Sequence, residues 1–172
     1  MSPKPKPTSP TPISWDEYFM GMALLAAKRS KDPHTQVGAC IADPDKRIVG
    51  LGYNGMPNRC SDHDFPWVQG DPTQNLESKY LYVCHAELNA ILNANTASLK
   101  GCRLYVPLFP CNECAKAIIQ AGISEIIYLS DKYSTTLSVQ ASKRMFAAAG
   151  VSFRPLSTDL TDLSISYRPE DV

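Results

Sequence analysis

Two short stretches of the sequence combine side chains that can bind a metal ion and move a proton. The first is His85-Ala86-Glu87, and the second is Pro110-Cys111-Asn112-Glu113-Cys114. Two cysteines at positions i and i+3 lie on one face of a helix, so both sulfurs can reach the same ion. With the imidazole of His85 as a third ligand, the set suits Zn²⁺, which prefers thiolate sulfur and imidazole nitrogen.

The number of ligands indicates whether such a zinc is structural or catalytic. A structural zinc has four protein ligands, whereas a catalytic zinc keeps one position for water. His85, Cys111 and Cys114 make only three. Two thiolates offset the charge of Zn²⁺ and leave its water less acidic, so a nearby base such as Glu87 would help to activate that water.

The alternative is a closed structural zinc in a non-catalytic binding protein. Its fourth ligand would be one of three further residues: Cys84, Cys60 or His63. The Cys-x-x-His spacing of the last two would also fit part of a second zinc site, although two ligands alone do not make one.

Hydrophobic spacing predicts the elements that position these residues. Ser14 followed by Glu17 is a capping-box pattern, and apolar side chains at helical spacing predict a helix over 15–29. Further helices are expected at 84–93, at 110–122 with Pro110 in the first turn, and at 135–149. Short apolar runs predict strands at 37–42, 48–53, 103–108, 123–129 and 151–153.

The order of these elements predicts an α/β fold. The turn Asp43-Pro44-Asp45 favours an antiparallel hairpin of the first two strands. Strands and helices alternate in the second half, which indicates parallel pairing and a mixed sheet of about five strands covered by helices. We expect a disordered Pro-rich leader at 1–13, one domain at 14–155 and a tail at 156–172.

Composition argues against several classes of protein. Seventeen basic residues balance seventeen acidic ones, so the basic excess typical of nucleic-acid binding is absent. The sequence has no apolar run long enough to span a bilayer and no secretory signal, which predicts a cytoplasmic protein. In that reducing compartment, paired cysteines favour metal binding over disulfides.

With these motifs, the sequence resembles the cytidine deaminase superfamily and, within it, the deoxycytidylate (dCMP) deaminases. The pattern His-x-Glu followed by Pro-Cys-x-x-Cys is the zinc deaminase signature, and the resemblance covers about Trp15 to Phe153. Six stretches carry it: Arg29–Pro33, Val37–Ile41, Gly52–Pro57, Cys84–Ile91, Phe109–Ala115 and Ser130–Tyr133.

The resemblance implies a three-layer α/β/α fold and a reaction. The reaction is the hydrolytic deamination of dCMP to dUMP and ammonia, which supplies the precursor of dTMP. His85, Cys111 and Cys114 become the zinc ligands, and Glu87 becomes the group that takes a proton from water and passes it to the ring nitrogen. Relatives that act on cytidine, on adenosine in tRNA or on a riboflavin precursor share the metal motif, so they remain alternatives.

Substrate contacts are less specific in the sequence. Asn54 is similar to the family's substrate-contacting asparagine, although Asn-Gly is also a common turn pair. Lys132 and Tyr133 follow a predicted strand, where α/β folds often place ligands, but they also fit a surface turn.

The resemblance also implies a homo-oligomer, a hexamer, regulated by dCTP as activator and dTTP as inhibitor. Arg29 and Lys31 can supply charge for a triphosphate, with Mg²⁺ offsetting the rest. Gly52 and Gly55, which flank Asn54, lack a Cβ that would block its approach. Otherwise these residues only end a helix and shape a turn in an unregulated enzyme.

Overall fold

Five strands form one sheet in the order β2-β1-β3-β4-β5 in the computed structural model, which describes residues 12–168. The hairpin strands β1 and β2 are antiparallel, β1 is also antiparallel to β3, and β3, β4 and β5 are parallel. The mixed sheet predicted from the sequence is therefore confirmed. The bounds of the strands are Gly38–Ala42 (β1), Ile48–Tyr53 (β2), Arg103–Leu108 (β3), Glu125–Ser130 (β4) and Ser152–Pro155 (β5).

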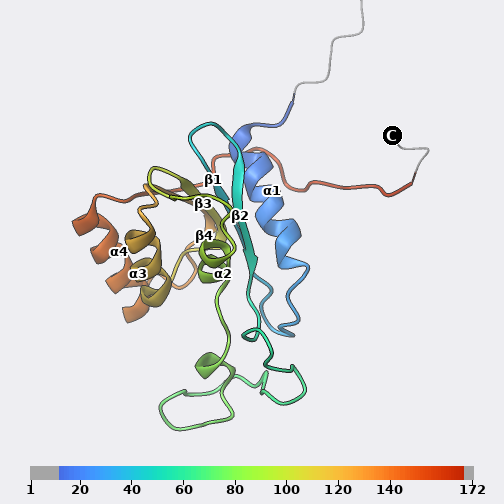
Figure 1. Cartoon of the computed structure of the whole chain (residues 1–172), viewed down its shortest axis with the longest axis vertical. Helices are drawn as coiled ribbons and strands as arrows, with labels where there is room; N and C mark the ends of the chain where they lie inside the picture. Colours follow the sequence, from blue (N-terminus) through green and yellow to red (C-terminus); the bar gives the residue numbers. More distant parts are fainter. Residues whose placement is uncertain (1–11, 169–172) are drawn as a thin grey trace, which may run out of the picture.

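Helices cover both faces of the sheet and make three layers (Figure 1). One face carries α1 (Trp15–Ala27), whose Phe19 packs with Tyr105 and Ile127 of the sheet. The other face carries three helices, and there Ile41, Leu104 and Ile126 of the strands join their core. Successive side chains of a strand point to opposite faces, so one apolar strand supplies both cores. The three helices are α2 (Ala86–Leu92), α3 (Asn112–Ala121) and α4 (Leu137–Ala149).

The predicted capping box of α1 is present. Ser14 Oγ accepts a hydrogen bond from the N–H of Glu17 (3.2 Å), and the Glu17 carboxylate accepts one from the N–H of Ser14 (2.7 Å). The helix ends at Ala27, two residues before the predicted end, because the N–H groups of Lys28 and Arg29 turn to carbonyls three residues earlier.

The start of α3 corrects one expectation. Pro110 does not open this helix, which begins at Asn112 with Cys111 as its N-cap. Cys111 has an extended backbone (φ −74°, ψ 172°), which is the conformation of an N-cap rather than of a helical residue. The metal-binding sequence therefore begins one position outside the helix.

The long polar segment after β2 is held at its two ends. Residues 54–78 contain no helix or extended strand, and a short 3₁₀ helix, η1 (Lys79–Leu81), follows. Gly55 and Cys84 exchange backbone hydrogen bonds of 3.1 and 2.9 Å, so the segment leaves β2 and returns to the same place just before α2.

The two ends of the chain are only partly described. Most of the predicted leader, 1–11, lies outside the described residues, and so does the end of the tail, 169–172. The described tail has no helix or strand, but Leu156 packs against the α1 side of the core and Thr158 bonds to Glu17. The domain boundaries stay predictions. None of the described helices has the length and hydropathy to cross a membrane.

Candidate active site

Two helix N-termini converge on the His, Cys, Cys set. His85 is the N-cap of α2, Cys111 is the N-cap of α3, and Cys114 lies in the first turn of α3. Their ligand atoms all lie within 4.8 Å of one another. The open N–H groups of a helix N-terminus stabilise negative charge, so this location favours thiolates.

The spacing of these atoms fits Zn²⁺. Nδ1 of His85 lies 3.4 Å from Sγ of Cys111 and 3.4 Å from Sγ of Cys114. Tetrahedral zinc with ordinary Zn–N and Zn–S bonds places these atoms about 3.6 Å apart. The three side chains therefore need almost no rearrangement to bind one ion.

The three groups share protons unequally. The hydrogen bond from Cys114, and then the neighbouring His85, lower the pKa of Cys111 to about 4 despite its burial. The hydrogen bond between His85 and Cys111 raises the pKa of His85 to about 9. The hydrogen bond between Cys114 and Cys111, together with burial, raises the pKa of Cys114. Metal binding displaces the remaining protons, because zinc takes thiolates and neutral imidazole.

Glu87 lies at the floor of the pocket beside this set. It is in the first turn of α2, two residues after His85, and only 5 % of its surface is exposed. Burial raises its pKa above the ordinary value of a glutamate. A carboxyl with a raised pKa can hold a proton between two steps of a reaction, as a general acid and base must.

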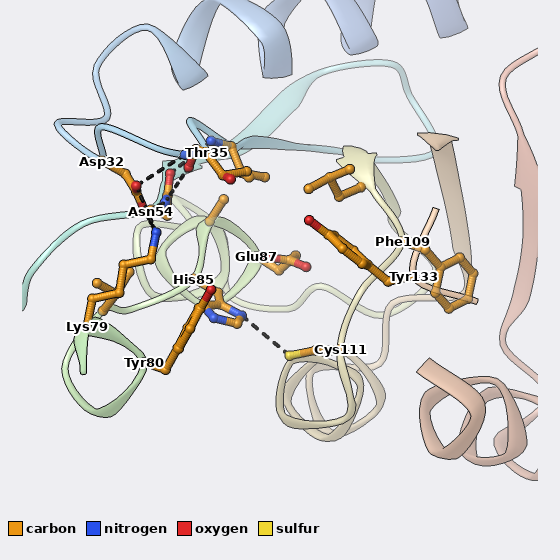
Figure 2. A pocket seen from close by; sticks show the side chains of 14 residues that line it. Asp32, Thr35, Asn54, Lys79, Tyr80, His85, Glu87, Phe109, Cys111 and Tyr133 are labelled. Atoms are coloured by element: carbon orange, nitrogen blue, oxygen red, sulfur yellow. Dashed lines mark hydrogen bonds and ion pairs between the residues drawn. The ribbon is translucent and has the colours of Figure 1, made fainter. Parts of the chain in front are cut away.

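A pocket of about 330 Å³ opens above Glu87 and His85 (Figure 2). Asp32, Asn54 and Lys79 form a polar side. Phe109 and Tyr133 lie on the other side. In Figure 2 the Glu87 carboxylate lies between the polar side and the aromatic side of the pocket. A flat polar ring bound between these two sides would therefore contact Glu87.

Asn54 lines this pocket and is buried. Its Nδ2 donates to Asp32 Oδ2 (3.2 Å) and to the carbonyl of Thr35 (3.0 Å), and its Oδ1 accepts from the N–H of Val37 (2.9 Å). The sequence prediction placed Asn54 in the site but did not foresee that the protein itself uses most of its hydrogen-bonding capacity.

Of the other two predicted substrate contacts, only Tyr133 lines the pocket. Lys132 lies beside it, with Nζ 4.9 Å from the centre of the Tyr133 ring. It is exposed and forms no ion pair with a described residue.

Sequence reasoning missed the pairing of Asp32 with Lys79, and it missed Tyr80. The two charged residues are 47 positions apart, and no motif joins them. The only signal was a lysine between an irregular polar segment and two tyrosines, which is too common to interpret. Tertiary structure alone brings them together.

The prediction that Gly52 lacks a Cβ so that a triphosphate can approach is wrong. A Cβ on this residue would lie 2.3 Å from the carbonyl oxygen of Ala86 and 2.3 Å from the nitrogen of Ala90. Its bare backbone is therefore needed for the packing of β2 against α2. Gly55 has open space at its Cβ position, while its N–H and carbonyl are bonded to Cys84.

The other candidates lie away from the metal-binding set. Arg29 is exposed, and Lys31, also exposed, forms an ion pair with Asp62. Cys60 and His63 do not join a third ligand, since the described part of the chain holds a single group of three metal-binding side chains.

Comparisons with known proteins agree with this geometry. Residues 13–130 match the family described as "Cytidine and deoxycytidylate deaminase zinc-binding region". The chain is 54% identical to human deoxycytidylate deaminase over 90% of this chain and 86% of the relative. It is 58% identical to a probable deoxycytidylate deaminase of Drosophila melanogaster, covering 83% and 72% of the two chains.

A solved structure of a dCMP deaminase has a similar fold. The dCMP deaminase of the cyanophage S-TIM5, determined in complex with dCMP and dUMP, superposes with a TM-score of 0.61 at 26% identity, covering 81% of this chain and 95% of that one. The match to the family's zinc-binding region, the close relatives and the shared fold lead to one conclusion. This chain belongs to the cytidine and deoxycytidylate deaminase family.

Proposed function

We propose that this protein is a zinc-dependent hydrolase that converts dCMP and water into dUMP and ammonia. The observation that carries the proposal is the buried carboxyl of Glu87 beside a three-ligand metal set at the floor of a pocket. The substrate is supported by the curated relatives named deoxycytidylate deaminases and by the structural neighbour that binds dCMP and dUMP.

The chain's own residues divide the work. His85, Cys111 and Cys114 hold the zinc, which when bound acidifies a water molecule and polarises the reacting centre. Glu87 accepts a proton from that water on a carboxylate oxygen and delivers it to the ring nitrogen. The water oxygen bonds to the ring carbon that carries the amino group. Glu87 then takes the second proton from that oxygen and gives it to the amino group, so that the carbon–nitrogen bond breaks, ammonia leaves, a carbonyl remains on the ring and the carboxylate is restored. Burial helps Glu87 to hold each proton in between, because it raises the pKa of this carboxyl.

Lys132 is our candidate for the 5′-phosphate. The one lysine or arginine among the described residues that line the pocket, Lys79, is already paired with Asp32. Lys132 has no such partner in the described chain and lies against Tyr133 at the pocket wall. An exposed ammonium over the ring of a tyrosine that lines the pocket suits a phosphate, which accepts charge-assisted hydrogen bonds from a lysine.

A substrate panel tests this assignment. Ammonia release is measured side by side with dCMP, dCTP, deoxycytidine and CMP, and zinc content is determined on the same preparation. We expect dCMP to be strongly preferred and one zinc to be present per chain. If deoxycytidine were turned over as efficiently as dCMP, the nucleotide assignment would be withdrawn.

The same panel addresses the alternatives. Preference for cytidine, a riboflavin precursor or adenosine in tRNA would move the enzyme elsewhere within the superfamily. Zinc binding without any deamination would instead indicate a structural metal in a binding protein.

Regulation is the finer part of the proposal. We expect dCTP with Mg²⁺ to activate and dTTP to inhibit, through the loop that carries Asn54 and Gly55 and the charges of Arg29 and Lys31. An effector must bind two states of the protein unequally, because equal affinity shifts nothing. dCMP saturation curves that superimpose with and without either nucleotide would remove regulation and leave catalysis intact.

The hexamer and the cytoplasmic location also stay proposals that follow from the resemblance and the sequence. Light scattering should give about six times the chain mass of 18.9 kDa. A mass near that of one chain would contradict the assembly.

A further inference from the structure

A buried ion pair lies in the wall of the pocket. Nζ of Lys79 is 2.6 Å from Oδ2 and 2.8 Å from Oδ1 of Asp32, and the two side chains are 4% and 2% exposed. Asp32 belongs to the segment between α1 and β1, and Lys79 begins η1. The pair therefore fastens two segments far apart in sequence on the polar side of the site (Figure 2).

Asp32 accepts more hydrogen bonds than this one pair. Its Oδ1 also accepts from the N–H groups of His34 (2.8 Å) and Thr35 (3.1 Å). Its Oδ2 accepts from Nδ2 of Asn54 (3.2 Å). A carboxylate has about four lone-pair sites, so Asp32 has no capacity left for a ligand. It acts on other side chains.

Asn54 is a pocket residue whose side chain Asp32 holds directly by a hydrogen bond. Asp32 and the carbonyl of Thr35 take both hydrogens of its Nδ2, and the N–H of Val37 takes one lone pair of its Oδ1. One acceptor lone pair remains. The substrate group that meets Asn54 must then donate a hydrogen bond, as a hydroxyl or amino group does, and a phosphate oxygen is excluded.

The ion pair also fixes the chain segment that contains Lys79 and Tyr80. The N–H of Lys79 donates to the carbonyl of Val68 (2.9 Å), and its carbonyl accepts from the N–H groups of Tyr82 and Val83. Tyr80, the next residue, lines the pocket, and Lys79 Nζ lies 5.5 Å from the centre of its ring. The chain then runs directly into His85.

Stability does not explain an ion pair in this place. Removing two charges from water costs several kcal/mol for each ion, and well-packed apolar side chains often stabilise a protein equally well. This ion pair lies in the wall of the pocket and is bonded to Asn54, a residue that lines it. Its cost in free energy is therefore better explained by a role in arranging the pocket. We infer that Asp32 is a positioning residue for substrate binding, which fixes the Asn54 amide as an acceptor and, through Lys79, holds Tyr80 at the pocket. This inference rests on the proposed function.

Three variants separate positioning from simple support of the fold. In Asp32→Asn the new amide group faces Nδ2 of Asn54 and Nζ of Lys79, so donors face donors. In Lys79→Met the carboxylate still holds Asn54, but it is buried without a cation. The double variant D32N/K79M contains neither buried charge, yet its Asn54 still meets an amide donor.

The expected results differ between stability and binding. We expect D32N to raise KM for dCMP about tenfold and K79M to raise it less, with kcat changed less than about threefold and one zinc retained per chain. The double variant should recover a melting temperature above both single variants while its KM stays as high as that of D32N. A double variant with the KM of the unmodified protein would overturn the inference.

A control outside the pocket is the partly exposed ion pair of Arg154 with Asp16 (2.6 Å) and Glu125 (2.9 Å). Arg154→Met should lower the melting temperature and leave KM unchanged. If KM for dCMP also rose in Arg154→Met, the rise in KM would reflect lost stability rather than lost positioning of pocket side chains, and the inference would fail.

A second measurement keeps the inference separate from the choice of substrate. If the unmodified protein did not deaminate dCMP, the proposed function would fail, and the Asn54 side chain could still be observed by NMR. Both of its amide hydrogens should be protected from exchange in the unmodified protein, and the hydrogen that bonds to Asp32 should lose this protection in D32N, while the one that bonds to the Thr35 carbonyl keeps it. Equal exchange in both proteins would refute the positioning role whatever the substrate.

Discussion

The backbone of Gly52 lies directly against that of Ala86, whose carbonyl oxygen would stand 2.3 Å from a Cβ on the glycine. This contact seats α2 on β2, and α2 carries Glu87 in its first turn with His85 as its N-cap. The distance between strand and helix is thereby set by a residue that does not itself line the pocket.

Gly52→Ala should therefore damage both stability and the site. Overpacking of this kind typically costs ~1–3 kcal/mol. That corresponds to a melting temperature lower by roughly 2–4 °C for each kcal/mol in a chain of this size. Zinc affinity and kcat should fall together, because α2 moves. Calorimetry and zinc titration test this, with Gly55→Ala as a control whose new Cβ has its nearest neighbour 4.0 Å away.

Replacement of Glu87 by glutamine should separate metal binding from catalysis. The amide has the same shape but cannot carry the proton, so kcat should fall by ~10²–10⁴, the usual contribution of a general acid and base. The zinc content and the melting temperature should stay close to those of the unmodified protein. Wild-type activity in this variant would rule out the proposed role of Glu87.

Removal of the Lys132 ammonium should weaken the binding of nucleotide but not of nucleoside. We expect Lys132→Met to raise KM for dCMP roughly tenfold, since a charge-assisted hydrogen bond contributes about 1.5–3 kcal/mol and exposure reduces it. Turnover of deoxycytidine should not change. Lys100→Met, at another exposed lysine, is the matched control. Equal effects on both substrates would contradict a phosphate contact.

The pH dependence of protein stability should reveal the lowered pKa of the Asp32 carboxyl. Burial raises the pKa of this carboxyl, but the hydrogen bonds from Lys79 and from the N–H groups of His34 and Thr35 outweigh it and hold the pKa below the usual value. The unfolded chain, with a pKa of about 3.9, then binds the proton more readily. The stabilisation is complete above that pH and is lost as pH falls through the folded pKa.

Asp32→Asn cannot titrate at this position. Its melting temperature should therefore fall less steeply than that of the unmodified protein below about pH 4. Thermal unfolding of both proteins from pH 3 to pH 7 tests this, because acid effects on the zinc ligands are common to both. Parallel curves would contradict the pKa shift.

Local sequence was sufficient for most of the fold. The capping box at Ser14, the hairpin turn and the apolar runs each depend on residues a few positions apart, and the structure confirms the elements they predict. The alternation of strands and helices then fixed parallel pairing in the second half, because a crossover returns a strand in the same direction. Pro110 was misplaced because N′ and N1 differ by two residues, a distance that local pattern does not resolve.

The sequence by itself also determined the metal-binding residue types, since a motif of two cysteines, a histidine and a glutamate has few chemical uses. What only tertiary structure decided is the rest of the pocket. Asp32 meets Lys79 across 47 residues, and Gly52 proves to be a packing residue once α2 lies over β2. Such contacts depend on how whole elements pack, and no periodicity along the chain encodes which loops will face each other.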